Sequence, residues 1–306
     1  MSSIPNPFGK DDYVQEGVNP SAGVLLLACT VGDDYDNPKN RIILWKDDSS
    51  FEFGSSGEAV LSIDATDDGN AFVLGENGTV IQFRWKGVTT QEELRSSRSL
   101  IINDAVVNIG PLRRLRLVGR DILCVGSVGQ VYQLRDGRFE ALPRLKIGGI
   151  EPTIEDVAGS DATNFLAVTS DGLGAKFGSS GWQDLDLPSN TKLSSICAMA
   201  GGGYGIAGSN GTLITGQPDR WQLVESTNLE RHYWGVAWLN GLLYAAHLSG
   251  IDVLSDGELT PITLPVRPAL EFTVLRTGVD GIWSFAGQTV GLLKGTEWQT
   301  FLSGRN

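Results

Sequence analysis

The chain has 306 residues, and 41% of them are hydrophobic, which is enough apolar surface for a folded core. Its 36 acidic and 24 basic residues give a net charge of −12, which disfavours nonspecific binding to nucleic acid. Because no apolar stretch is long enough to cross a bilayer, we also expect no membrane partner.

Pairs of apolar runs joined by a tight polar or glycine turn recur about every 40 residues along the chain. The residues that mark the seven turns are Asn40, Gly78, Gly129, Gly172, Gly211, Gly250 and Thr289. The runs have the length of strands, and Gly, Asn and Asp separate them. We therefore predict an all-β fold, a seven-bladed β-propeller of four-stranded antiparallel blades, as a single domain over residues 1–306.

The first repeat is the least regular of the seven. Its first strand is predicted at Tyr13–Val18, and a long acidic loop, Gly32–Asn40, precedes the strand Arg41–Trp45. An insertion, Val88–Leu100, follows the second repeat. Within this insertion, Gln91–Arg95 is predicted to form one or two helical turns.

Four arginines lie close together in the third repeat: Arg113, Arg114, Arg116 and Arg120. Such a cluster is able to contact phosphate or an acidic protein. We interpret these residues instead as outward positions of a strand and its turn.

The fifth repeat shows the four-strand order most clearly. Its strands are predicted at Leu193–Met199, Tyr204–Gly208, Thr212–Thr215 and Trp221–Val224. Other repeats place Asp-Gly or Asn-Gly pairs between two apolar runs, as at Asp136-Gly137, Asn240-Gly241 and Asp256-Gly257. These pairs favour hairpins because both residues tolerate a positive φ.

The turns Gly75–Gly78, Gly126–Gly129 and Gly208–Gly211, together with the downstream Trp182 and Trp221, resemble a known kind of repeat. They are similar to repeats of WD-repeat, YVTN-type and sialidase-like propellers, and especially of photosystem assembly factors. The resemblance implies the propeller fold. It does not select a function, because propellers serve as scaffolds, inhibitors, lectins and enzymes.

Few residues are suited to catalysis. The two histidines, His232 and His247, have no His or Cys neighbour at metal-ligand spacing, and the chain has no Gly-x-Ser-x-Gly motif. The segment Gly203–Gly208 matches the dinucleotide-binding pattern, but it continues into a hairpin instead of a helix. We therefore predict that the protein is not an enzyme and needs no cofactor.

The three cysteines, Cys29, Cys124 and Cys197, lie in apolar strand runs, which favours buried, reduced thiols over disulfides or a metal site. The first residues lack the basic start and apolar core of a signal peptide. We expect a cytoplasmic protein.

The predicted partner-binding residues are acidic and aromatic. In a propeller, the turns between second and third strands lie on the same face as the connections between blades, and insertions on such a face often bind partners. The acidic loop supplies Asp33, Asp34, Tyr35 and Asp36, and other turns and connections supply Glu76, Asp171, His232 and Tyr233. We expect Trp234, the neighbour of Tyr233, to be a packing residue.

The preferred hypothesis is a noncatalytic propeller that binds a basic protein. A specific form of it is an immunity protein that neutralises a basic toxin, such as a nuclease, by mimicking the charge of nucleic acid. The alternative is a metal-centred propeller hydrolase or small-ligand binder, with Asp156 and Glu271 as contributors near the inner strands.

Overall fold

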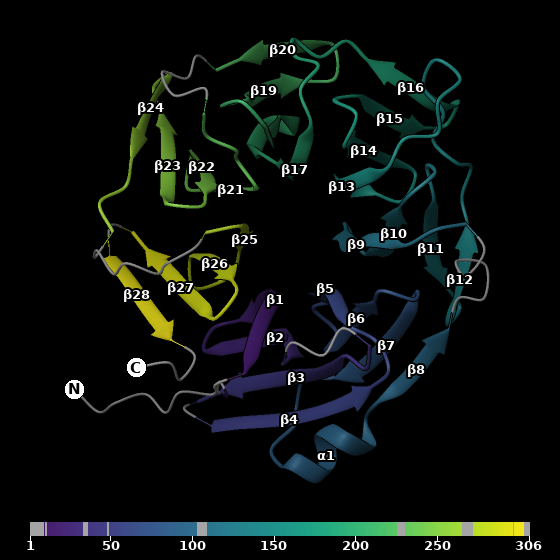
Figure 1. Ribbon diagram of the computed structural model, residues 1–306, viewed down its shortest axis with the longest axis vertical. Helices are drawn as coiled ribbons and strands as arrows, with labels where there is room; N and C mark the ends of the chain where they lie inside the picture. The colour runs from purple at the N-terminus through teal and green to yellow at the C-terminus, as the bar shows by residue number, and fades with distance from the viewer. Residues whose placement is uncertain are drawn as a thin grey trace. The chain divides into compact units, whose positions relative to one another are not determined.

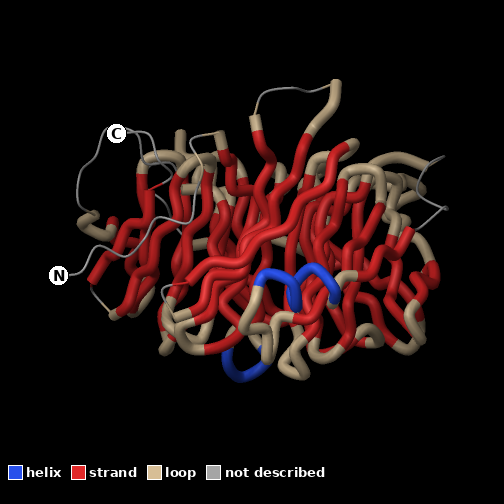
Figure 2. The backbone as a smooth tube through the Cα atoms, turned by 90° about the horizontal axis from the view of Figure 1, so that it is seen from below, coloured by secondary structure: helices blue, strands red, loops and turns tan. Residues whose placement is uncertain are grey.

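The computed structural model describes residues 9, 11–32, 36–47, 49–102, 109–224, 230–264, 272–295 and 297–302. Over these residues the chain forms seven four-stranded antiparallel sheets, each with its strands in chain order (Figure 1). Strands make up nearly all of the regular structure (Figure 2). This is the architecture of a seven-bladed β-propeller, and it confirms the predicted fold class.

The contacts divide the chain into two compact units, residues 1–104 with 276–306 and residues 105–275. We call them unit 1 and unit 2 and describe each by itself. The boundary near residue 275 falls within strand β25 (Val274–Thr277). The prediction of a single domain stays a prediction.

Unit 1 contains three of the sheets. The first has β1 (Asp12–Ser21), β2 (Val24–Val31), β3 (Lys39–Lys46) and β4 (Ser49–Ser56). The second has β5 (Val60–Ala65), β6 (Asn70–Gly75), β7 (Thr79–Arg84) and β8 (Ser99–Ile102). The third continues from β25 with β26 (Ile282–Ala286), β27 (Thr289–Lys294) and β28 (Glu297–Leu302).

Unit 2 contains four sheets. The first has β9 (Leu112–Val118), β10 (Asp121–Gly126), β11 (Val131–Arg135) and β12 (Arg138–Ala141). The second has β13 (Ile154–Asp161), β14 (Asn164–Thr169), β15 (Gly174–Gly178) and β16 (Gly181–Leu185). The third has β17 (Leu193–Ala198), β18 (Tyr204–Gly208), β19 (Leu213–Gln217) and β20 (Arg220–Leu223). The fourth has β21 (Gly235–Leu239), β22 (Leu242–His247), β23 (Gly250–Ser255) and β24 (Glu258–Pro261).

The predicted hairpin turns form as expected. Asp136 and Gly137 connect β11 to β12 with φ values of 47° and 75°, and Asp256 and Gly257 connect β23 to β24 with 51° and 84°. Two positive φ values in a two-residue loop match the right-handed twist of the flanking strands. The strands of the fifth repeat also agree with the prediction to within two residues at each end.

The insertion after β7 contains a helix, α1 (Gln91–Ser96), as predicted. The Thr90 side chain accepts a hydrogen bond from the Glu93 backbone N–H, and the Glu93 side chain accepts one from the Thr90 N–H. This capping box stabilises the first turn. Leu94 attaches the helix to the core of unit 1, where it is fully buried.

Within each unit, the turns between second and third strands lie next to the segments that connect sheets. In unit 1, the Glu76 N–H donates to the Ala59 carbonyl oxygen at 2.9 Å. In unit 2, the Gly211 N–H donates to the carbonyl oxygen of Arg231 at 2.7 Å. These bonds place the two kinds of connection at the same sheet edge, as predicted.

Candidate functional site

A pocket of about 330 Å³ in unit 2 brings together aromatic, charged and apolar side chains. The segment that enters β21 and the turn between β22 and β23 supply its walls. We call it the Trp234 pocket, and its residues are Glu230, Arg231, His232, Trp234, His247, Leu248 and Ser249.

Backbone hydrogen bonds fix the segment that enters β21. The Tyr233 N–H donates to the Gly208 carbonyl oxygen at 3.0 Å, and the Trp234 N–H donates to the Ala246 carbonyl oxygen at 2.8 Å. The segment is therefore held to two neighbouring sheets of unit 2, and the Trp234 side chain has a defined position at their edge.

Two lining residues of the pocket, Arg231 and His247, belong to a polar cluster around the buried Asp252. Asp252 is fully buried and accepts a hydrogen bond from the Tyr233 hydroxyl at 2.6 Å and another from the Arg231 guanidinium. His247 Nε2 is 3.6 Å from the other Asp252 oxygen. Burial, with Asp252 beside it, raises the pKa of Tyr233 to about 12, so Tyr233 stays a hydrogen-bond donor.

His232 supports Trp234 from one side. The two rings stack with their centroids 3.8 Å apart and their planes at 20°. The His232 ring is itself held by two hydroxyls, Ser194 Oγ at 2.9 Å from Nε2 and Ser209 Oγ at 3.0 Å from Nδ1. Both residues of the stack are thus preorganised before any partner arrives.

The neutral form of His232 is favoured. Burial, together with the positive charge of Lys192, lowers the pKa of His232 below its usual value of 6.5. Near neutral pH the ring is therefore uncharged, and it presents a flat aromatic surface to Trp234.

Two large apolar side chains of the pocket are exposed. Trp234 has 36% of its surface exposed and Leu248 has 54%. An aromatic anchor on a rigid support, surrounded by polar groups, is typical of the centre of a protein–protein interface.

The other predicted binding residues are distributed over both units. Asp33, Asp34 and Tyr35 lie outside the described residues. In unit 1, Asp36 is exposed, and Glu76 Oε1 accepts a hydrogen bond from the Ala59 N–H at 3.2 Å. In unit 2, Asp171 is exposed in the turn between β14 and β15. The predicted partner contacts of these residues stay predictions.

Tyr233 needs a correction. It is 0% exposed and binds Asp252, so in this structure it supports the surface from below and does not contact a partner. Trp234 packs on His232 as expected, but it is also 36% exposed, which the expectation did not include. The alternation of side chains along an extended segment sends neighbours to opposite sides, but the sequence left open which of the two points outward.

The carboxylates considered for a metal do not form a metal site in the described part of the chain. Asp156 is 1% exposed and pairs with Arg116 Nε at 2.7 Å, while Ser195 Oγ donates to its other oxygen at 3.0 Å. Arg116 is 8% exposed, so its assignment to an outward position is wrong. Glu271 lies outside the described residues, and none of the described His, Cys, Asp and Glu side chains form a group of three or more suited to a metal.

Comparison with solved structures identifies the fold. YCF48 from Cyanidioschyzon merolae matches with a TM-score of 0.69 and 16% identity, over 94% of this chain and 96% of that one. The WD40 β-propeller domain of Doa1 matches with a TM-score of 0.70 and 13% identity, over 92% of each chain. The chain is a seven-bladed β-propeller. At these identities the likeness shows the fold alone, and this is the fold that the resemblance to WD-repeat and related propellers implied.

A further similarity is found among characterised proteins. The propeller is 26% identical over 203 residues to the immune protein Tsi7 of Pseudomonas aeruginosa. The match covers 64% of this chain and 66% of Tsi7. No protein-family profile matches the propeller's sequence.

No helix of the described residues is long and apolar enough to span a membrane.

Proposed function

We propose that this chain is a noncatalytic, protein-binding propeller that acts as an immunity protein by binding a toxin. The observation that carries the proposal is the similarity to the immune protein Tsi7 over 203 residues. The propeller fold is compatible with this role, because its blades offer rigid edges on which loop residues bind partners.

The Trp234 pocket is the contact that we assign to the toxin. Trp234 and Leu248 are the exposed apolar anchors, and the neutral His232 holds the indole in place. Because the anchor is ordered in advance, little conformational entropy is lost when a partner covers it. Arg231 and Glu230 also line the pocket, and we assign to them the polar contacts that such interfaces carry.

We further propose that the toxin is basic, and that a nuclease is the first class to test. The net charge of −12 supports this choice, because opposite charges accelerate association and exclude acidic partners. Binding of this kind weakens as salt rises, which separates it from purely apolar association.

The experiment compares two exposed leucines of unit 2. Leu248 belongs to the Trp234 pocket, whereas Leu223 is 42% exposed at the end of β20. Tagged chain, its Leu248→Asp variant and its Leu223→Asp variant are each used to capture partners from lysate of their own source, at low and at high salt. We expect one basic protein in stoichiometric amount with the unmodified chain and with Leu223→Asp, and its loss with Leu248→Asp.

Alanine variants then give the size of the effect. With the purified partner, Trp234→Ala should weaken binding by about 2 kcal/mol or more, roughly thirtyfold, as measured by titration calorimetry. If no stoichiometric partner is recovered at low salt, the immunity function is rejected. If both aspartate variants capture the partner equally well, the assignment of the Trp234 pocket as the contact is rejected.

A further inference from the structure

We propose that a second pocket, in unit 1, binds an arginine side chain of a protein against the ring of Trp45. This inference concerns a different site from the Trp234 pocket and does not depend on the immunity role.

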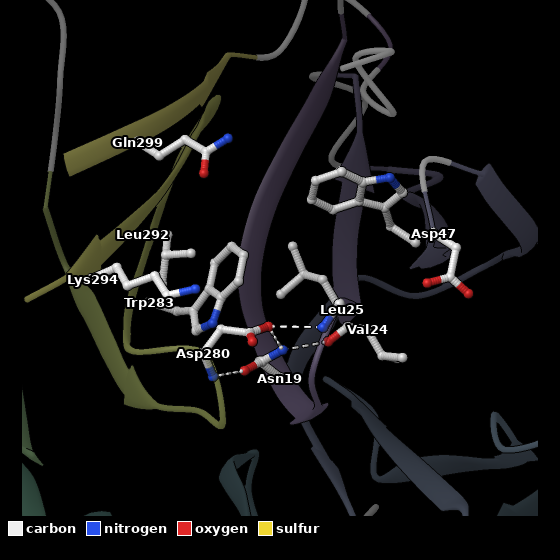
Figure 3. Close-up of a pocket in the computed structure, with 11 residues that line it drawn as sticks. Asn19, Val24, Leu25, Asp47, Asp280, Trp283, Leu292, Lys294 and Gln299 are labelled. Atoms are coloured by element: carbon white, nitrogen blue, oxygen red, sulfur yellow. Dashed lines mark hydrogen bonds between the residues drawn. The ribbon is translucent and has the colours of Figure 1, made fainter. Parts of the chain in front are cut away.

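The pocket has a volume of about 290 Å³ and lies between two sheets of unit 1 (Figure 3). We call it the Trp45 groove, and its residues are Asn19, Gly23, Val24, Leu25, Trp45, Asp47, Asp280, Trp283, Leu292, Lys294 and Gln299. Pockets for drug-sized ligands have about 300–1,000 Å³, so this one is suited to a single side chain or a small fragment.

A hydrogen-bond network makes the base of the groove rigid. Asn19 is 3% exposed, and its Nδ2 donates to the Val24 carbonyl oxygen at 2.6 Å and to Asp280 Oδ2 at 2.9 Å. The backbone N–H of Asp280 donates back to Asn19 Oδ1 at 2.7 Å, and the Gly23 N–H donates to Asp280 Oδ2 at 2.9 Å (Figure 3). Two turns, each from a different sheet, are thereby tied together.

This network orients a carboxylate at the groove. Both donors to Asp280 approach the same oxygen, Oδ2, and its Oδ1 accepts no hydrogen bond from any part of the chain that the structure describes. A second carboxylate, Asp47, is exposed just after β3. Two carboxylates, of which Asp280 is held in place, therefore border a pocket that Trp45 and Trp283 also line.

These features favour an arginine side chain as the occupant. A guanidinium is planar, stacks on indole faces and donates several hydrogen bonds to carboxylates. The half-buried Trp45 offers a ring surface. Trp283 also lines the pocket, but it is 3% exposed and its ring is stacked on Phe285, so it serves as apolar lining. Leu25 and Leu292 provide contact for the aliphatic part of the side chain. Among the residues that line the groove, Lys294 is the one cation, so it opposes a cationic occupant.

The test uses a small peptide and the complete chain. The protein is labelled with 5-fluorotryptophan, and the resonances of Trp45 and Trp283 are assigned with the variants Trp45→Phe and Trp283→Phe. Acetyl-Gly-Arg-Gly-amide is titrated to ~10 mM, a range suited to weak binding. The same peptide with norleucine in place of arginine is the neutral control.

We expect the arginine peptide, and not the norleucine peptide, to shift the Trp45 resonance saturably. Asp47→Asn should weaken this binding about threefold or more, the size expected of a close charge contact. Lys294→Met, a change at an exposed side chain, should strengthen this binding. Leu248→Asp changes the other pocket and should leave the titration unchanged.

The proposal is overturned if the arginine peptide produces no saturable shift, or if the norleucine peptide binds equally well. It is also overturned if Lys294→Met weakens binding, because the groove would then prefer an anion. Because these results come from a peptide and not from a toxin, they are independent of the immunity function.

Discussion

At the scale of single residues, the Trp234 pocket shows how buried polar groups define an exposed anchor. Asp252 accepts a hydrogen bond from the Tyr233 hydroxyl, and this bond helps to position the segment that enters β21. The His232 ring, which is hydrogen-bonded to two serines, stacks on Trp234. The position of the exposed Trp234 indole therefore depends on these contacts. Substitutions beneath the surface should therefore change partner binding without touching the partner.

The protonation of His232 should lower the stability of the protein in mild acid. Its pKa is below 6.5 in the folded state, so the unfolded state binds more protons as the pH falls through that value. The free energy of unfolding should decrease from about pH 7.5 to about pH 5.5, and the loss should be complete below the folded-state pKa. Urea unfolding at pH 7.5 and at pH 5.5 measures this decrease in the free energy of unfolding.

The matched variant for this measurement is His232→Gln, which keeps a side chain able to bond to serine but does not titrate. We expect it to lose less stability over this pH interval than the unmodified chain. An equal loss in both proteins would assign the pH dependence to other groups.

The three cysteines should be unreactive while the protein is folded. All three are free thiols, and burial raises the pKa of Cys29 and Cys124 strongly and that of Cys197 to about 12. Thiolates are the reactive form, so a disulfide reagent should label none of them in the native protein and all three in denaturant. Cys29 and Cys124 are the buried residues and Cys197 is partly exposed, so rapid labelling of Cys29 or Cys124 without denaturant would contradict the structure.

At the scale of elements, one arrangement links neighbouring first strands in both units. In unit 2, Asp156 of β13 accepts from Arg116 of β9, and from Ser195 Oγ and the Ile196 N–H of β17. In unit 1, Glu16 of β1 lies 3.5 Å from Arg276 of β25 and accepts from Ser62 Oγ and the Ile63 N–H of β5. In each case one carboxylate joins three consecutive sheets.

Removal of such a carboxylate should be costly. Asp156→Ala leaves Arg116 buried without its counter-charge, and the expected loss of stability is about 3–5 kcal/mol. Asp171→Ala, at an exposed turn of the same unit, should change stability by about 0.5 kcal/mol or less. Urea unfolding measures the free energy of unfolding of both variants. Similar losses of stability in the two variants would show that the buried pair of Asp156 and Arg116 does not stabilise the fold.

These links also show what the sequence could and could not predict. The four-stranded repeats, α1 and the Asp-Gly hairpins follow from local patterns, because turn chemistry and strand alternation act over a few residues. The pairing of Asp156 with Arg116 joins residues 40 positions apart, and no local pattern marks it. The sequence therefore did not distinguish Arg116, which is buried, from its exposed neighbour Arg113, for which the outward assignment is correct.

At the scale of the whole molecule, both parts of unit 1 are far apart in the sequence but pack together. The Val14 N–H of β1 donates to the Gly287 carbonyl oxygen at 2.6 Å, next to the end of β26. The Trp45 groove also depends on this association, since Asn19 and Asp280 come from these two parts of the chain. Repeats along the sequence predicted the blades, but the groove arises only when the first and last sheets of unit 1 meet.

The central claim is that this propeller neutralises a toxin by binding it at the Trp234 pocket. The most direct measurement is a growth assay. The captured partner is expressed in cells, either alone or together with the chain or one of its variants, and cell growth is recorded. We predict that the partner alone stops growth, that the chain and its Leu223→Asp variant restore it, and that Leu248→Asp does not. A partner that is harmless alone, or that remains toxic in the presence of the unmodified chain, would contradict the account.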